Sequence, residues 1–82
     1  MTKLEEKLKE LGYKQNLIMP YLYYKNMNIC IIYADLNIDR TQCKLQLNGI
    51  EPINDDEEFN SLFQAYNTMQ KDLEGLKKYE EN

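Results

Sequence analysis

The sequence predicts an α+β domain of two layers, in which an antiparallel sheet is packed against helices. Residues near the two ends of the chain show apolar positions at helical spacing, and the middle of the chain is rich in branched and aromatic residues. The expected order is therefore α-β-β-β-α, a three-stranded antiparallel meander with both helices on one face. Eighty-two residues are enough for a single domain, which we take to span residues 1–82.

A short amphipathic helix is predicted for about residues 3–11. Thr2 followed three positions later by Glu5 fits a capping box, and Gly12 stands where a helix commonly stops. Its apolar residues are spaced by four and three positions: Leu4, Leu8 and Leu11.

Three strands are predicted at about residues 17–25, 28–34 and 41–48. Pro20 cannot donate a ladder hydrogen bond, so the first strand lies at an edge or pairs only beyond Pro20. The second strand is apolar on both faces and is therefore expected to be central. The third alternates between apolar and polar residues, which predicts one face in water.

A second helix is predicted for about residues 55–79, with Asn54 as its N-cap and four acidic residues in its first turn, where the helix dipole favours negative charge. Its length of about 37 Å exceeds that of a five-residue strand, about 17 Å, so part of the helix is expected to project beyond the sheet. The apolar stripe expected to face the core is Phe59, Leu62, Tyr66, Met69, Leu73 and Leu76.

The composition excludes several classes of protein. An apolar fraction of 43% with seven tyrosines is too rich for a disordered segment, and no apolar run is long enough to span a membrane. The charged start of the chain does not read as a secretory signal, so we expect a cytoplasmic protein. In that compartment Cys30 and Cys43 are expected to be reduced thiols rather than a disulfide.

No catalytic site, metal site or cofactor is expected. The chain contains no histidine, the commonest general base and metal ligand, and its two cysteines lack the spacing of a zinc site. Residues 35–39 match the start of a calcium-binding loop, D-x-N-x-D. Because Arg40 then stands where that loop requires glycine, a solvated turn is the expected structure.

Negative charge is concentrated late in the chain. Residues 1–50 hold seven basic and five acidic side chains, whereas residues 51–82 hold three basic and nine acidic ones, four of them consecutive at residues 55–58. Direct binding to nucleic acid needs clustered lysine and arginine, which this chain lacks. An acidic segment without catalytic groups predicts instead a protein that binds other proteins.

The element order resembles that of double-stranded RNA-binding domains, but that family has lysines at the start of its second helix, where this chain has Asp55–Glu58. In size, order and charge the chain is more similar to small acidic proteins of phages and mobile elements, including some anti-CRISPR proteins. The resemblance covers the whole chain as architecture and composition, without a diagnostic motif. It implies an inhibitor that occupies a nucleic-acid-binding site on a host protein by imitating phosphate.

Two groups of side chains are candidates for partner binding. Acidic residues would imitate phosphate, and tyrosines on the uncovered face of the sheet would supply an apolar anchor, unless they only shield an ordinary outer face. The alternative function is a homodimeric structural or adaptor protein, joined through the C-terminal helix or the tyrosine-rich sheet face. The candidate residues are Asp55, Asp56, Glu57, Glu58, Glu51, Asp72, Glu74, Tyr21, Tyr23 and Tyr33.

Overall fold

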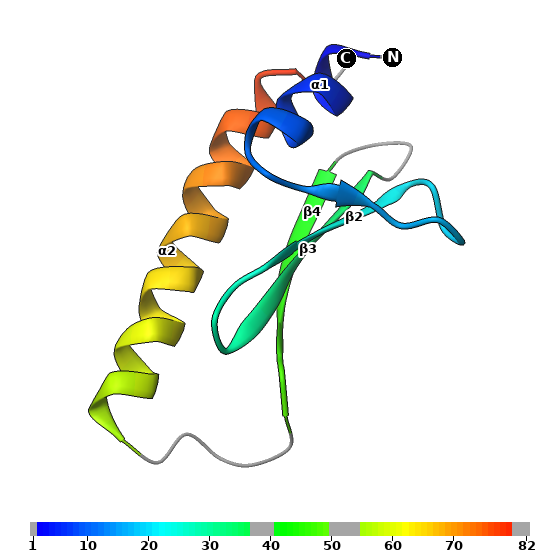
Figure 1. Cartoon of the computed structure of the whole chain (residues 1–82). Helices are drawn as coiled ribbons and strands as arrows, with labels where there is room; N and C mark the ends of the chain where they lie inside the picture. Colours follow the sequence, from blue (N-terminus) through cyan, green and yellow to red (C-terminus); the bar gives the residue numbers. More distant parts are fainter. Residues whose placement is uncertain (1, 37–40, 50–54, 80–82) are drawn as a thin grey trace.

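Two helices and four strands make up the part of the protein that the computed structural model describes, residues 2–36, 41–49 and 55–79. Figure 1 shows the long second helix beside the sheet. The short first helix lies near the C-terminal end of the second helix (Figure 1). The α+β class is confirmed, whereas the prediction of three strands is wrong. The elements are α1 (Lys3–Glu10), β1 (Lys14–Gln15), β2 (Leu22–Asn26), β3 (Cys30–Leu36), β4 (Thr41–Leu47) and α2 (Asp56–Lys77).

The four strands form one antiparallel sheet in the order β1-β2-β3-β4, so β1 and β4 are the edges of the described sheet. In the register, Tyr23 of β2 lies opposite Ala34 of β3, and Ala34 lies opposite Cys43 of β4. The additional strand, Lys14–Gln15, pairs with Tyr23 and Tyr24 of β2. Two polar residues carry no strand pattern, which is why the sequence did not predict this strand.

The strand β2 begins at Leu22 rather than at residue 17, because the residues before it form a loop. The Asn16 side chain accepts hydrogen bonds from the backbone N–H groups of Ile18 and Met19, both at 2.9 Å. An asparagine that binds the backbone in this way stabilises a turn in competition with a strand. The apolar residues 17–21 therefore form the β1–β2 loop.

Helix α1 has a well-defined stop. The N–H of Gly12 donates to the carbonyl of Lys9 at 3.0 Å, and the N–H of Tyr13 donates to the carbonyl of Leu8 at 2.9 Å. This hydrogen-bond pair is a Schellman motif, which needs a left-handed residue, and Gly12 has φ of 96°. The motif turns the chain so that Tyr13 and Leu8 both enter the core.

The core lies between the sheet and the helices. Sheet residues from one face meet Leu8 of α1 and two residues of α2; the buried cluster is Leu8, Tyr13, Tyr23, Ile32, Ala34, Met69 and Leu76. Within the described ranges, neither helix has the length and apolar character needed to cross a membrane.

The buried side of α2 differs from the expected stripe. The helix buries Ala65, Met69, Asp72 and Leu76. Phe59 and Tyr66 instead remain about half exposed, because α2 lies mainly over the edge strand β4, and no further strand of the described residues covers that side of the helix. Asp55 caps the helix, its Oδ1 accepting from the N–H of Glu58 at 2.8 Å, while the expected cap Asn54 lies outside the described residues.

Candidate functional site

An apolar groove of about 370 Å³ lies between α2 and the edge strand β4, and we call it the α2–β4 groove. Phe59 is 58% exposed and Phe63 is 56% exposed, so large apolar side chains line an open surface. Contiguous exposed aromatic side chains usually mark a binding surface. The groove is lined by Leu45, Leu47, Phe59, Leu62, Phe63 and Tyr66.

The groove follows from the periods of the two elements that form it. Side chains alternate along β4, so Leu45 and Leu47 share the face that packs against α2. Phe59, Phe63 and Tyr66 are spaced by four and three residues and so follow one side of α2. In the described sheet β4 pairs only with β3, so its other edge leaves the groove open.

The acidic turn, Asp55–Glu58, directly precedes the groove residue Phe59 in the chain. All four of its residues are exposed, and Asp55 also caps the helix. The negative charge therefore has a structural role, since it stabilises the helix N-terminus. It also makes the electrostatic potential at one end of the groove negative, which would attract a basic segment of a partner.

The remaining predicted acidic residues have different positions. Glu74 is exposed, but it follows Glu58 by 16 positions, or about 24 Å along the helix axis. Glu51 lies outside the described residues. Asp72 is buried, so the expectation that it lies on the partner-binding surface is wrong.

Asp72 belongs to a buried polar cluster. Its Oδ2 accepts a hydrogen bond from the hydroxyl of Tyr13 at 2.9 Å and pairs with the Lys25 ammonium at 3.2 Å. The same ammonium lies 5.2 Å from the centroid of the Tyr13 ring. Burial, and then the charge of Asp72, raise the pKa of Tyr13 far above its usual value. The cluster therefore joins the end of α1, β2 and α2, and its role is in the fold.

The three predicted tyrosines do not share one surface. Tyr23 is buried in the core, so its expected place on an exposed face is wrong. Tyr33 is on the opposite face of the sheet, where it lines a hollow of about 470 Å³ with Tyr24 and Ile31. Tyr21 is exposed at the end of the β1–β2 loop. The outer face of the sheet is therefore a second candidate surface.

The two cysteines are free thiols, and Cys30 is buried. Burial raises the pKa of Cys30, and burial together with the negative charge of Asp72 raises the pKa of Cys43 to about 11. Because the thiolate is the reactive form, both groups are poor nucleophiles at neutral pH. In the described part of the chain, no group of three or more His, Cys, Asp or Glu side chains is placed to hold a metal ion.

Sequence reasoning missed three residues of the groove. Leu45 and Leu47 were expected in a strand at one edge of the meander, but the sequence does not show which residues of α2 they face. Phe63 fell outside the expected stripe of α2. Its spacing from Phe59 and Tyr66 by four and three positions was the available signal of a second apolar side on the helix.

Comparison with known proteins adds no relative: no family model matches the chain, and neither a curated protein nor a solved structure matches it.

Proposed function

We propose that the protein is a non-enzymatic inhibitor that binds another protein through the α2–β4 groove. In this proposal the groove takes an apolar segment of the partner, and the acidic turn faces basic residues beside that segment. A nucleic-acid-binding host protein offers basic residues of this kind, and occupying its site would exclude the nucleic acid. The exposed aromatic groove ending at the acidic turn is the observation that carries the proposal.

The character of the groove favours a protein partner over a small molecule. Small-molecule sites usually enclose the ligand and orient it with a few placed polar groups. The only polar side-chain group among the groove residues is the hydroxyl of Tyr66. An open apolar surface with charge at one end is instead typical of a protein interface, in which apolar contacts give affinity and charges direct association.

The test begins with affinity purification of the partner from the native host and its identification by mass spectrometry. Binding of the purified partner is then measured for Phe63→Asp and for the double variant Asp56→Lys with Glu57→Lys. We expect the first change to abolish binding, because it places a charge in the apolar groove. The second should weaken binding most at low salt, since exposed charges are screened by salt.

Glu74→Lys is the matched control, because it reverses an exposed acid on the same helix that lies about 12 Å along the helix axis beyond Tyr66, the last groove residue. It should leave binding nearly unchanged. Unaltered binding by Phe63→Asp would contradict the role of the groove. A complex in which the partner still binds its nucleic acid would contradict inhibition by occupation of that site.

A homodimer joined through α2 is the second candidate function. The helix begins with the acidic turn and carries Lys71 and Lys77 in its later part. Antiparallel pairing of two copies would bring these opposite charges together and cover the exposed aromatic residues. Light scattering tests this candidate, and a monomer at hundreds of micromolar would exclude it.

A further inference from the structure

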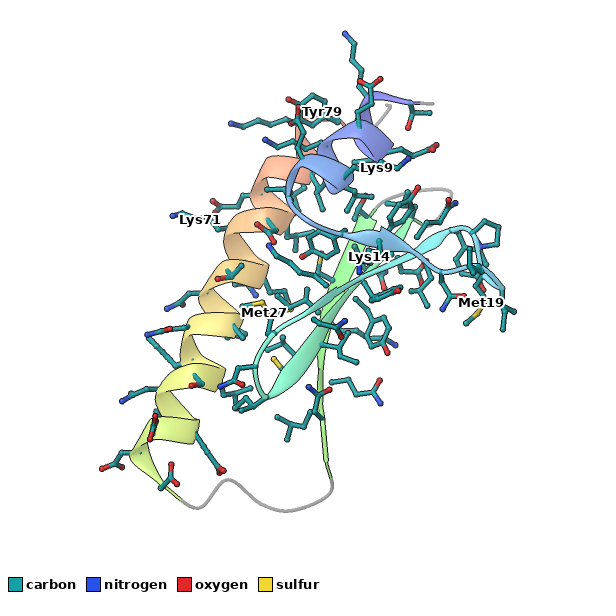
Figure 2. The ribbon with its side chains drawn as sticks, viewed as in Figure 1. Lys9, Lys14, Met19, Met27, Lys71 and Tyr79 are labelled. Carbon is teal, nitrogen blue, oxygen red and sulfur yellow. The ribbon has the colours of Figure 1, made fainter. Side chains whose placement is uncertain are left out.

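The β1–β2 loop exposes the most solvent-accessible large apolar side chains of the described protein. Leu17 is 98% exposed and Ile18 is 88% exposed. Figure 1 shows the loop projecting from the sheet on the side away from α2, and Figure 2 shows Met19 at its tip. Apolar side chains placed in water in this way usually mark a binding surface.

Hydrogen bonds hold the loop in this conformation. Besides the two N–H groups that bind the Asn16 side chain, the Nε2 of Gln15 donates to the carbonyl of Pro20 at 2.7 Å. The N–H of Leu22 donates to the carbonyl of Met19 at 2.9 Å. These polar groups are satisfied within the loop while its apolar side chains face outward. A loop ordered before binding loses little entropy when it binds.

One exposed positive charge lies beside the loop, while the acidic Asp35 of β3 lies opposite Leu22 where the loop ends. Residues 13–34 contain two lysines and no acidic residue. Lys25 is paired with Asp72 inside the protein, whereas Lys14 of β1 is exposed beside the loop. The loop thus projects as an apolar surface (Figure 1) with the positive charge of Lys14 beside it, and it also borders the hollow on the outer face of the sheet; the groove is a concave apolar surface with the acidic turn at its end.

We infer that the β1–β2 loop of one copy docks in the α2–β4 groove of a second copy. This inference rests on the proposed role of the groove as a protein-binding site, and it names the segment that enters it. Because the two surfaces lie on different sides of the molecule, the contact is heterologous and leads to head-to-tail chains or closed rings. Self-association and binding of a foreign partner then compete for the same groove.

Two variants test the inference, each blocking one of the two surfaces. The loop variant is Leu17→Asp with Ile18→Asp, and the groove variant is Phe63→Asp. All three positions are exposed, and circular dichroism of each variant checks that the fold is retained. Sedimentation velocity of the unmodified protein should show a mass that rises with concentration beyond that of a dimer. Each variant alone should associate at least about tenfold more weakly, the loss expected when a central interface residue is removed.

The decisive sample is an equal mixture of the loop variant and the groove variant. One copy then supplies an intact loop and the other an intact groove, so the mixture should form a heterodimer that does not grow further. Glu74→Lys is the control and should associate like the unmodified protein. Failure of the mixture to associate overturns the inference, as does a loop variant that associates like the unmodified protein, which would favour symmetric pairing of α2.

Other results separate this inference from the proposed function. The unmodified protein could be monomeric while the groove variant, and not the loop variant, fails to bind the foreign partner. That result overturns self-association and leaves the proposed function standing. The mixture of the two variants could associate while Phe63→Asp leaves binding of the foreign partner unchanged. That result supports self-association and contradicts the proposed function. Binding to vesicles of anionic lipid that requires Leu17 and Ile18, without self-association, overturns the inference in favour of a membrane contact.

Discussion

Replacing Asp72 with asparagine should destabilise the protein strongly, although the two side chains have nearly the same shape. The Asp72 side chain is 8% exposed, and its Oδ2 contacts both the Tyr13 hydroxyl and the Lys25 ammonium. Removing one charge of a buried ion pair costs about 3–5 kcal/mol, because the other charge remains unpaired. Lys25 is 21% exposed and can reach some water, so we expect the lower end, about 3 kcal/mol.

This loss is large for a domain of 82 residues, whose whole free energy of unfolding is about 4–12 kcal/mol at 0.05–0.15 kcal/mol per residue. At roughly 4–8 °C per kcal/mol, the melting temperature should fall by about 12 °C or more. Urea unfolding at pH 7, followed by circular dichroism, measures the change. Tyr13→Phe removes only the hydrogen bond to the carboxylate and should cost about 1.5–3 kcal/mol.

The double variant of Tyr13→Phe and Asp72→Asn should be more stable than the sum of the single changes implies, since both remove the same contact. Glu74→Gln is the matched control: it neutralises an exposed carboxylate on the same helix and should change the free energy of unfolding by less than about 0.5 kcal/mol. If Asp72→Asn were as harmless as this control, the buried cluster would not stabilise the fold and the reasoning would be refuted.

Alanine should have opposite effects at two glycines, again measured by urea unfolding. At Gly75, inside α2, a Cβ meets only the Lys7 Cε at 3.9 Å, so the free energy of unfolding should rise by up to about 1 kcal/mol. At Gly12, which has φ of 96°, alanine should lower the free energy of unfolding by about 1 kcal/mol, because a side chain is strained in that conformation. Equal effects of alanine at both sites would contradict the assigned conformations. The pKa of Cys43 is raised from 9.0 to about 11, so its thiol contributes fully to stability below pH 9, and this contribution is lost as the pH rises through 11. Cys43→Ala should therefore lose less stability between pH 9 and pH 11, and an identical decline in both proteins would rule out this role of the thiol.

Local signals in the sequence account for the ends of α1. Thr2 accepts a hydrogen bond from the N–H of Glu5 at 3.1 Å, and Gly12 supplies the left-handed residue after the helix. Both depend on residues within one helical turn, so a short sequence window contains the relevant information. The same holds for the helical period of α2, although not for the direction in which that helix faces.

Which side of α2 faces the core depends on residues far away in the chain. The helical period predicts Tyr66 in the core, and the phosphate-mimic interpretation predicts Asp72 on the partner-binding surface. Asp72 is buried because Tyr13 and Lys25, 59 and 47 positions earlier, supply its partners. The groove could not be predicted for a similar reason, since the predicted core stripe of α2 includes Phe59 and Tyr66, which the packing of the helix leaves about half exposed. The candidate site was therefore predictable as an acidic turn, but not as a groove.

The order in which the residues of the core and of the buried polar cluster are synthesised has a consequence for folding on the ribosome. Tyr13 and Lys25 leave the ribosome before the whole of β3, β4 and α2, whereas Asp72 and Leu76 come after all the strands. A nascent chain that has made only the sheet still exposes its apolar inner face and has no acceptor for the Lys25 ammonium. Folding of the domain should therefore wait until α2 has emerged, and a chain cut before residue 72 should be captured by chaperones or degraded rather than accumulate.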